Sequence, residues 1–326
     1  MPPVLEREDG RPRRIGVEIE TIGPSISELS GIVAAFLDGE VREISRYEHE
    51  VTGDDAGVWT VKLDMAWLVE KGRRPHEGDG ALELLDELAE VVLRAGAEQL
   101  VPLEIVTPPI PMLRLPPIQT LIARLREAGA QGTRKGLTYA FGMQLNPEMP
   151  ALDAVTIARY LKAFACLYEW LEARSSVDST RKLTGYVSAY PGRYVRRVAD
   201  PGYWPELGAL IDDYLEDNPT RNRALDLLPL FLHLDRERVR AVVKDERVKP
   251  RPALHYRLPN CEVDEENWGI DAAWEDWLEV ERLAADAERL EEICGRYCEH
   301  ADRLLENLLT DWAEEVETWI ESQSAR

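Results

Sequence analysis

The alternation in Gly16-Val17-Glu18-Ile19-Glu20-Thr21 constrains the fold more than any other feature of this sequence. Successive side chains of a β-strand point to opposite faces, so Glu18 and Glu20 share one face while Val17 and Ile19 share the other. The segment therefore predicts a strand that buries one face and carries two neighbouring carboxylates on the other. A strand with one solvated face shows the same alternation, so this segment alone does not separate a site from a surface.

The pattern becomes informative because later segments repeat it. Lys62 and Asp64 share a face of a predicted strand at 58–67, and Glu104 interrupts an apolar run at 103–106. Gln144 and Asn146 share a face just before Pro147. Four predicted strands thus offer oxygen-donor side chains, and these would gather on one sheet face if the strands are neighbours.

The first half of the chain predicts a mixed α+β fold. Short runs with period-two or continuous β-branched and aromatic character predict strands, and runs with apolar residues three and four apart predict amphipathic helices. The predicted strands are 15–22, 41–51, 58–67, 101–106 and 137–145, and the predicted helices are 25–37, 81–95 and 117–128.

The second half predicts mostly helices. One long apolar stripe runs through 151–175, and residues 188–246, richer in Pro and Arg, read as an inserted helical and loop subdomain. A last strand is predicted at 253–258, followed by acidic helices at 272–297 and 301–322. We expect one domain spanning 1–326, with a sheet core at about 13–150 and 252–260, a helical insertion at about 151–250, and C-terminal helices at about 266–323.

Net charge, the lack of long apolar runs and the cysteine spacing argue against several classes of protein. The net charge of −22 argues against sequence-independent binding to nucleic acid or to an anionic membrane. Residues 1–9 lack the basic and apolar parts of a signal peptide, and no run approaches the roughly 20 apolar residues of a membrane span, so a cytoplasmic protein is expected. The four cysteines form no CxxC pair and are expected to be buried thiols.

Oxygen donors from several strands suit Mg²⁺, which prefers carboxylates and is often completed by substrate phosphates. A shared cation would also relieve the repulsion among clustered carboxylates. Arginines could contact phosphate, although each could equally form a surface ion pair in so acidic a chain. The candidates are Arg193, Arg196, Arg197, Arg221, Arg223 and Arg257. No P-loop or GxGxxG motif is present, so bound ATP would be held differently.

Five segments, taken in order, resemble the signature segments of the amidoligase family, which belongs to the glutamine synthetase and glutamate-cysteine ligase-like superfamily. They are Gly16–Glu20, Leu103–Pro109, Gly142–Asn146, Arg221–Asp226 and Tyr256–Leu258. The resemblance implies a curved antiparallel sheet with helices on one side, as in glutamine synthetase. It also implies a funnel where ATP and Mg²⁺ meet a small-molecule or peptide carboxylate and an amine.

The resemblance also assigns roles to individual residues. Metal ligands would be Glu18, Glu20 and Glu104, with Gln144 able to add an amide oxygen, and Glu18 would count as catalytic. Arg223 and Arg257 would neutralise the transferring phosphate and the tetrahedral intermediate. Asp64 matches an acidic position that could assist substrate or nucleotide binding. Independently of the resemblance, Asn146, Arg193 and Arg197 are candidates for binding the nucleotide or its phosphates. The product would be an amide or isopeptide bond formed through an acyl phosphate.

The sequence departs from the family pattern at four positions. Gln144 and Asn146 stand where a His-x-His pair is usual, Asp226 replaces a common Asn, and His255 replaces a Glu in the last strand. Amide side chains do not act as acid or base near neutral pH. These changes motivate an alternative, a non-catalytic module that binds a peptide or protein. A metal-dependent hydrolase on the same ligands is a third possibility.

Overall fold

The structure is a computed structural model that describes residues 1–63, 102–132, 142–175, 187–305 and 311–324. It confirms a mixed α+β fold built on one open, antiparallel, nine-stranded sheet. The strand order is β2-β3-β4-β5-β1-β7-β9-β8, and β6 pairs with the start of β1. The strands are β1 (Arg14–Thr21), β2 (Val41–Ser45), β3 (Glu48–Asp54), β4 (Gly57–Leu63), β5 (Leu103–Val106), β6 (Ile110–Pro111), β7 (Met143–Pro147), β8 (Leu225–Asp226) and β9 (His255–Tyr256).

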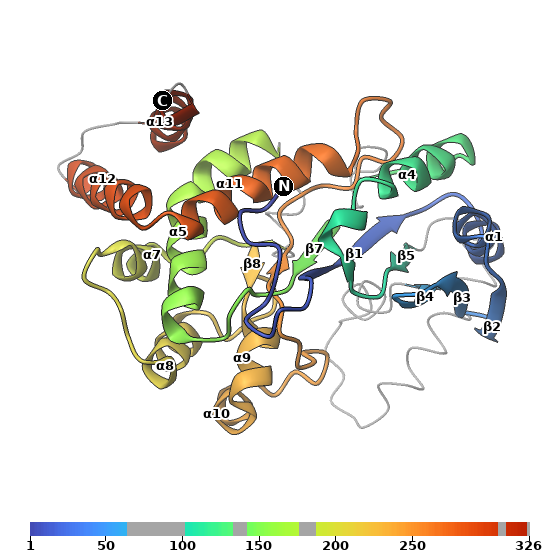
Figure 1. Cartoon of the computed structure of the whole chain (residues 1–326), viewed down its shortest axis with the longest axis horizontal. Helices are drawn as coiled ribbons and strands as arrows, with labels where there is room; N and C mark the ends of the chain where they lie inside the picture. The colour runs from blue at the N-terminus through green and yellow to red at the C-terminus, as the bar shows by residue number, and fades with distance from the viewer. Residues whose placement is uncertain (64–101, 133–141, 176–186, 306–310, 325–326) are drawn as a thin grey trace, which may run out of the picture.

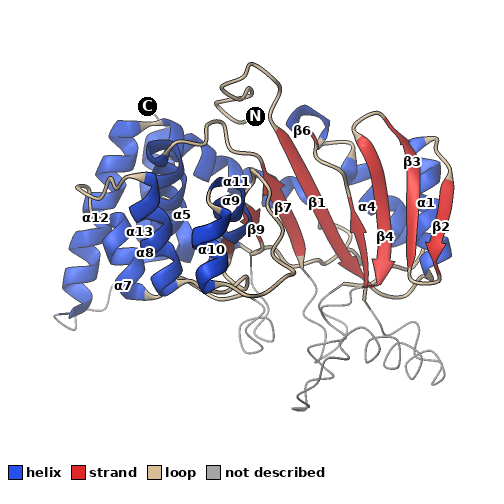
Figure 2. Cartoon of the chain, turned by 90° about the horizontal axis from the view of Figure 1, so that it is seen from below, coloured by secondary structure: helices blue, strands red, loops and turns tan. Residues whose placement is uncertain are grey.

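Helices pack in two groups along this sheet. α1 and α4 lie behind the β2–β5 end, and the remaining helices gather beyond the β7–β9 end (Figure 1, Figure 2). The first group is α1 (Ile26–Leu37) and α4 (Ile118–Glu127), with the short 3₁₀ helix η2 (Met112–Arg114) before α4. The second group is α5 (Ala154–Arg174), α7 (Gly192–Ala199), α8 (Leu207–Asp217), α9 (Leu228–Leu234), α10 (Arg236–Val242), α11 (Ile270–Ala285), α12 (Ala287–Leu305) and α13 (Trp312–Ser324).

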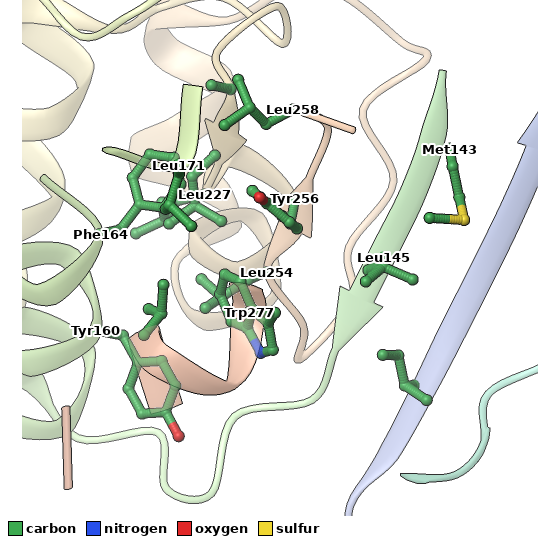
Figure 3. Close-up of a cluster of buried hydrophobic side chains, with 14 of the residues drawn as sticks. Met143, Leu145, Tyr160, Phe164, Leu171, Leu227, Leu254, Tyr256, Leu258 and Trp277 are labelled. Carbon is green, nitrogen blue, oxygen red and sulfur yellow. The ribbon is translucent and has the colours of Figure 1, made fainter. Parts of the chain in front are cut away.

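The apolar side of the strand alternation forms the core. Val17 and Ile19 of β1 are fully buried, as is Leu145 of β7. At the far end of the sheet, the ring of Tyr256 in β9 lies 5.2 Å from that of Trp277 in α11 and 6.1 Å from that of Phe164 in α5, measured between centroids (Figure 3). The core therefore joins the sheet to α5 and α11, and the polar side of the alternation is left on the opposite face.

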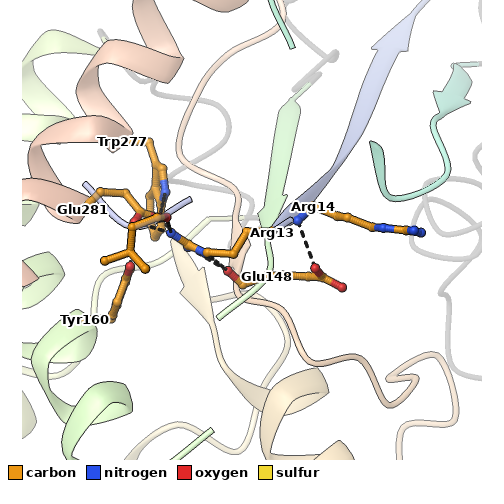
Figure 4. Close-up of polar contacts among 7 residues, drawn as sticks. Arg13, Arg14, Glu148, Tyr160, Trp277 and Glu281 are labelled. Atoms are coloured by element: carbon orange, nitrogen blue, oxygen red, sulfur yellow. Dashed lines mark hydrogen bonds and ion pairs between the residues drawn. The ribbon is translucent and has the colours of Figure 1, made fainter. Parts of the chain in front are cut away.

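A buried ion pair ties the start of β1 to these helices. Arg13 donates from both terminal nitrogens to the two carboxylate oxygens of Glu281, each at 2.8 Å, and both side chains are fully buried (Figure 4). Tyr160 Oη and Trp277 Nε1 donate to the same carboxylate at 2.6 and 3.0 Å. Burial alone would lower the pKa of the Arg13 guanidinium, but Glu281 outweighs burial and the pKa is raised.

The structure corrects four element predictions. The predicted strand 41–51 is a hairpin of two strands, β2 and β3, joined by a turn at Arg46-Tyr47. The sequence did not predict this turn because it lacks the Gly, Pro or Asn that usually marks one. The predicted helix 272–297 is split at Asp286, whose carboxylate accepts from Arg289 N and so caps α12. Residues 301–305, predicted to start the last helix, end α12 instead. The region 151–250, expected to be helix and loop, also supplies the edge strand β8.

Other predictions have mixed outcomes. The helices 25–37, 117–128 and 151–175 are confirmed as α1, α4 and α5. The predicted helix 81–95 lies outside the described residues. Cys166, Cys261 and Cys294 are buried thiols as expected, and Cys298 is half-buried. Curvature of the sheet and likeness to glutamine synthetase remain predictions.

Candidate functional site

The sheet register brings the sequence-predicted polar residues onto one face, which we call the polar face. Glu20 of β1 lies opposite Glu104 of β5, and Glu104 lies opposite Lys62 of β4. On the other side of β1, Glu18 lies opposite Gln144 of β7. Residues opposite each other in an antiparallel pair share a face, so the expected adjacency of these strands is confirmed.

Two carboxyl groups meet at the centre of the polar face. The Glu104 carboxyl lies close enough to the carboxyl group of Glu18 to affect its pKa. Their side chains are only 14% and 17% exposed, and Lys62 Nζ stands 3.1 Å from Glu104 Oε2. Two neighbouring carboxyl groups repel when both are ionised, and Lys62 relieves part of that repulsion. The pair is therefore a place where a hard cation could add to the charge of Lys62.

Opposing influences set the charge of Glu18. Burial would raise the pKa of its carboxyl, but the positive charges of His255, when protonated, and of Arg257 outweigh burial, together with the effect of Glu104. The pKa of Glu18 is therefore lowered, which favours its ionised form. Arg251 Nη1 adds a further positive charge 3.7 Å from Glu18 Oε1.

Glu20 is oriented toward the backbone. Its Oε2 accepts a hydrogen bond from Gly142 N at 2.8 Å, at the start of the segment that leads into β7. Within the described ranges, no group of three or more His, Cys, Asp or Glu side chains stands ready to hold a metal ion. The roles predicted for Glu18, Glu20, Glu104 and Gln144 as ligands remain predictions, and Asp64 lies outside the described residues.

A chain of amide side chains leads from Glu18 across the sheet. Asn146 Nδ2 donates to Glu18 Oε1 at 2.8 Å, and Gln144 Nε2 donates to Asn146 Oδ1 at 2.7 Å. Gln144 Nε2 also lies 3.1 Å from His255 Nδ1 in β9. Gln144, Asn146 and His255 are all buried. Buried polar groups are costly unless hydrogen-bonded, so this part of the sheet is an organised network rather than a solvated surface.

The side chains of the polar face described so far come from segments 14–21, 103–106, 143–147 and 255–257. All four segments lie within the range matched by a protein-family model. A family model described as "Putative amidoligase enzyme" matches residues 11–279. The chain belongs to this amidoligase family. Searches of curated proteins and of solved structures found no match. Membership supports a ligase-type enzyme. No described helix of the amidoligase is long and apolar enough to cross a membrane.

The far end of the amidoligase's polar face is basic. Tyr256 faces the core, so strand alternation places His255 and Arg257 together on the polar face. Arg221 lies in the loop before β8. Burial and the positive charge of Arg257 lower the pKa of its guanidinium. Burial and the Arg257 charge also lower the pKa of His255 to about 3, so the ring is neutral near pH 7.

Sequence reasoning missed Arg251 as a site residue. It lies in Lys249-Pro250-Arg251-Pro252, where no alternation or motif marks it, and only the fold brings it to Glu18. The neighbouring Lys249 and the two prolines were the only sequence features that could have drawn attention to this segment.

The other predicted arginines are held elsewhere by the protein itself. Arg223 donates to Ala189 O at 2.6 Å and to Asp217 O at 2.9 Å, so it braces the loop between α8 and β8. Arg193 pairs with Asp217, and Arg197 lies 3.0 Å from Asp213. Arg193 and Arg197 therefore lie at the contact between α7 and α8, and the structure does not bring them to the polar face. Their role in nucleotide binding stays a prediction.

Asp226 makes folding stability depend on pH. It lies opposite His255, is almost completely buried, and accepts from Leu228 N at 2.9 Å. Burial raises the pKa of its carboxyl to about 6, although the charges of Arg257 and Arg221 oppose the rise. A folded pKa above the unfolded value means that the ionised carboxylate opposes folding at pH values above about 6, and that this cost fades as pH falls toward 4.

Asp226→Asn is therefore expected to raise the free energy of unfolding at pH 7.5 but not at pH 4. A carboxyl pKa of about 6 in place of 3.8 corresponds to ~3 kcal/mol, taken as an upper estimate. Urea unfolding of both proteins across this pH range checks the result. A difference between them that stays constant with pH would show that Asp226 does not titrate as described.

Proposed function

We propose that this amidoligase is an ATP- and Mg²⁺-dependent carboxylate-amine ligase that works on the polar face of its sheet. The observation that carries the proposal is the closeness of the carboxyl groups of Glu18 and Glu104, which come from neighbouring strands and are mostly buried. Positive side chains flank the pair, with Arg251 near Glu18. Phosphoryl transfer commonly uses carboxylates that hold a cation and arginines that contact the phosphate. The polar face has both kinds of side chain.

The residues present fit Mg²⁺. Carboxylate oxygens are the ligands that this ion prefers, and a cation beside the neighbouring carboxyl groups of Glu18 and Glu104 would relieve their repulsion. Glu18 and Glu104 would hold the ion, and Glu20, next to Glu104 in register, would supply a further carboxylate. When bound, Mg²⁺ would neutralise negative charge on the phosphates of ATP.

In the proposed reaction, an oxygen of the substrate carboxylate attacks the γ-phosphorus of ATP and ADP leaves. The amine then attacks the carbonyl carbon of the acyl phosphate, loses a proton and displaces inorganic phosphate, which leaves an amide or isopeptide bond. The chain supplies charge and position rather than a nucleophile. Arg251 and Arg257 stabilise negative charge at the transferring group, and Asn146 orients Glu18 through its 2.8 Å hydrogen bond.

The substrates are proposed to be a small-molecule or peptide carboxylate and an amine, met in the cytoplasm. The sheet is proposed to follow the glutamine synthetase-like arrangement, with the helices on its apolar side. The polar face would then be the floor of the funnel in which nucleotide and acceptor meet.

An assay of amine-dependent ADP release tests the proposal. Purified protein with Mg²⁺ and ATP, screened against amino acids and small peptides, is expected to release ADP and phosphate in equal amounts only when a carboxylate and an amine are both present. Omitting Mg²⁺ should stop release. Product formed without ATP would point instead to a metal-dependent hydrolase and would contradict the ligase.

One observation favours the second candidate, a peptide- or protein-binding module without catalysis. Gln144 and Asn146 stand where the family usually has a His-x-His pair. Gln144 is hydrogen-bonded to both Asn146 and His255. Titration calorimetry separates the two candidates, because the ligase must bind ATP with Mg²⁺. Absence of nucleotide binding at millimolar concentration would favour the binding module.

A further inference from the structure

The amide chain on the polar face fixes the proton position on His255. A carboxylate only accepts hydrogen bonds, so the group of Asn146 that faces Glu18 is its NH₂. Its oxygen then faces Gln144, which must present an NH₂ in return. That same nitrogen lies 3.1 Å from His255 Nδ1. A ring nitrogen that accepts from an amide carries no proton, so His255 is neutral with its hydrogen on Nε2.

This leaves a buried donor without a partner. His255 is 6% exposed, and its Nε2 makes no hydrogen bond within the described part of the chain. A buried N–H that lacks an acceptor costs roughly 1–3 kcal/mol. Such a donor points to an acceptor that arrives with a ligand.

The surroundings of the donor favour an anion. Arg257, which directly follows β9, lies near enough for its charge to act on both His255 and Arg221. Arg221 forms no ion pair or hydrogen bond with any residue in the described ranges. Three carboxylates act on this group: Asp226, which accepts from Leu228 N, Asp245, which pairs with Arg247, and Glu18. Two guanidinium groups and an N–H donor together suit the oxygens of a phosphoryl or carboxylate group.

We propose that His255 donates a hydrogen bond from Nε2–H to an anionic oxygen of the ligand, beside Arg221 and Arg257, and so makes this end of the polar face an anion site. The proposal rests on the proposed function, and it divides the face in two. Glu18 and Glu104 take the cation at one end, Asn146 and Gln144 form the spacer, and His255 receives the phosphoryl or carboxylate oxygen at the other. His255 is then a positioning residue rather than an acid or base.

The tautomer is tested first, on protein with ¹⁵N-labelled histidine and no nucleotide. Long-range ¹H–¹⁵N correlation spectra distinguish the two neutral tautomers and the charged ring, and the signal missing from His255→Gln identifies His255 among the five histidines. The expected result is the Nε2–H tautomer in the wild type and a mixture of tautomers in Gln144→Leu, which loses the donor to Nδ1. An Nδ1–H tautomer in the wild type would overturn the proposal.

Anion binding is tested next by following the same signal during titration with inorganic phosphate, and separately with acetate, against chloride at equal ionic strength. Phosphate binding alone assigns the site to a phosphoryl group, and acetate binding alone assigns it to a carboxylate. His255→Leu should weaken the preferred anion by at least ~10-fold, measured by calorimetry, because hydrogen bonds to charged groups are worth about 1.5 kcal/mol or more. His255→Gln, which keeps a donor, should restore most of the affinity, and His255→Glu should abolish it.

No response to either anion, or equal affinity in the wild type and His255→Leu, would contradict the proposal. Because neither measurement uses ATP or an amine, these outcomes would leave the ligase proposal standing. Conversely, failure of the ligase assay would leave the anion site intact.

Discussion

Glu18→Gln is expected to lower amine-dependent ADP release by at least ~100-fold while the protein stays folded, because one well-placed electrostatic group is commonly worth that much or more in turnover. Glutamine keeps the size of the side chain and its acceptor for Asn146, whose amide donates to Glu18 at 2.8 Å. It removes the charge that would hold the cation beside Glu104. Steady-state kinetics at saturating ATP measures the loss, and calorimetric unfolding checks the fold.

Glu43→Gln is the matched control for Glu18→Gln. Glu43 lies in the exposed edge strand β2 of the same sheet, so its replacement makes the same change of charge away from the polar face. Turnover should stay at the wild-type level. Full activity in Glu18→Gln, or an equal loss in both variants, would remove Glu18 from the site.

Glu281→Gln is expected to reduce the free energy of unfolding by about 3–5 kcal/mol, because it leaves the cation of Arg13 buried without a counter-charge. The pair makes two 2.8 Å hydrogen bonds with no exposed side-chain surface, and the same carboxylate accepts from Tyr160 and Trp277. Loss of the charge therefore loosens the contact between β1 and α11. Urea or guanidinium unfolding at neutral pH measures the change.

Asp212→Asn is the control for this ion pair, because Asp212 pairs with Arg238 on the surface. Exposed pairs are worth about 0–1 kcal/mol, so the free energy of unfolding should fall by no more than that. Removing both charges, with Arg13→Met in a Glu281→Leu background, should recover part of the lost stability, because no uncompensated charge then remains. Similar losses in Glu281→Gln and Asp212→Asn would contradict the account of the buried pair.

The alternation of β1 predicted much of the sheet because side-chain direction in a strand is local. Val17 and Ile19 are buried as the pattern requires, and Glu18 and Glu20 are on the other face. What single strands do not specify is their order. The pairing of β1 with β5 on one side and β7 on the other comes from packing of the whole domain, and it alone places Glu104 and Gln144 beside Glu18.

The basic end of the site was less predictable, for two physical reasons. β8 and β9 are two residues long, too short to show a period, although Tyr256-Arg257-Leu258 was recognisable by resemblance. Arg251 approaches Glu18 from an irregular segment, where position depends on long-range contacts such as Arg251 N to Pro229 O at 3.0 Å. Arg193 and Arg197 illustrate the opposite error, since a cluster of basic residues in sequence is neutralised in the fold by Asp213 and Asp217.

The amide chain explains why buried polar residues stand where the family pattern has other groups. Gln144 and Asn146 satisfy each other and Glu18, so the network needs no protonated histidine to be stable. The sequence showed the substitutions, but their partners became visible only with the register of β1, β7 and β9. Replacement of one member is therefore expected to disturb the others.

The most direct test of the central claim, that Glu18 and Glu104 share a divalent cation, is an anomalous-scattering measurement on crystals grown with Mn²⁺, as a probe for Mg²⁺, and ADP. The account predicts a manganese peak in contact with both carboxylates. A structure in which manganese and ADP are bound elsewhere, while Glu18 and Glu104 contact no metal ion, would contradict it.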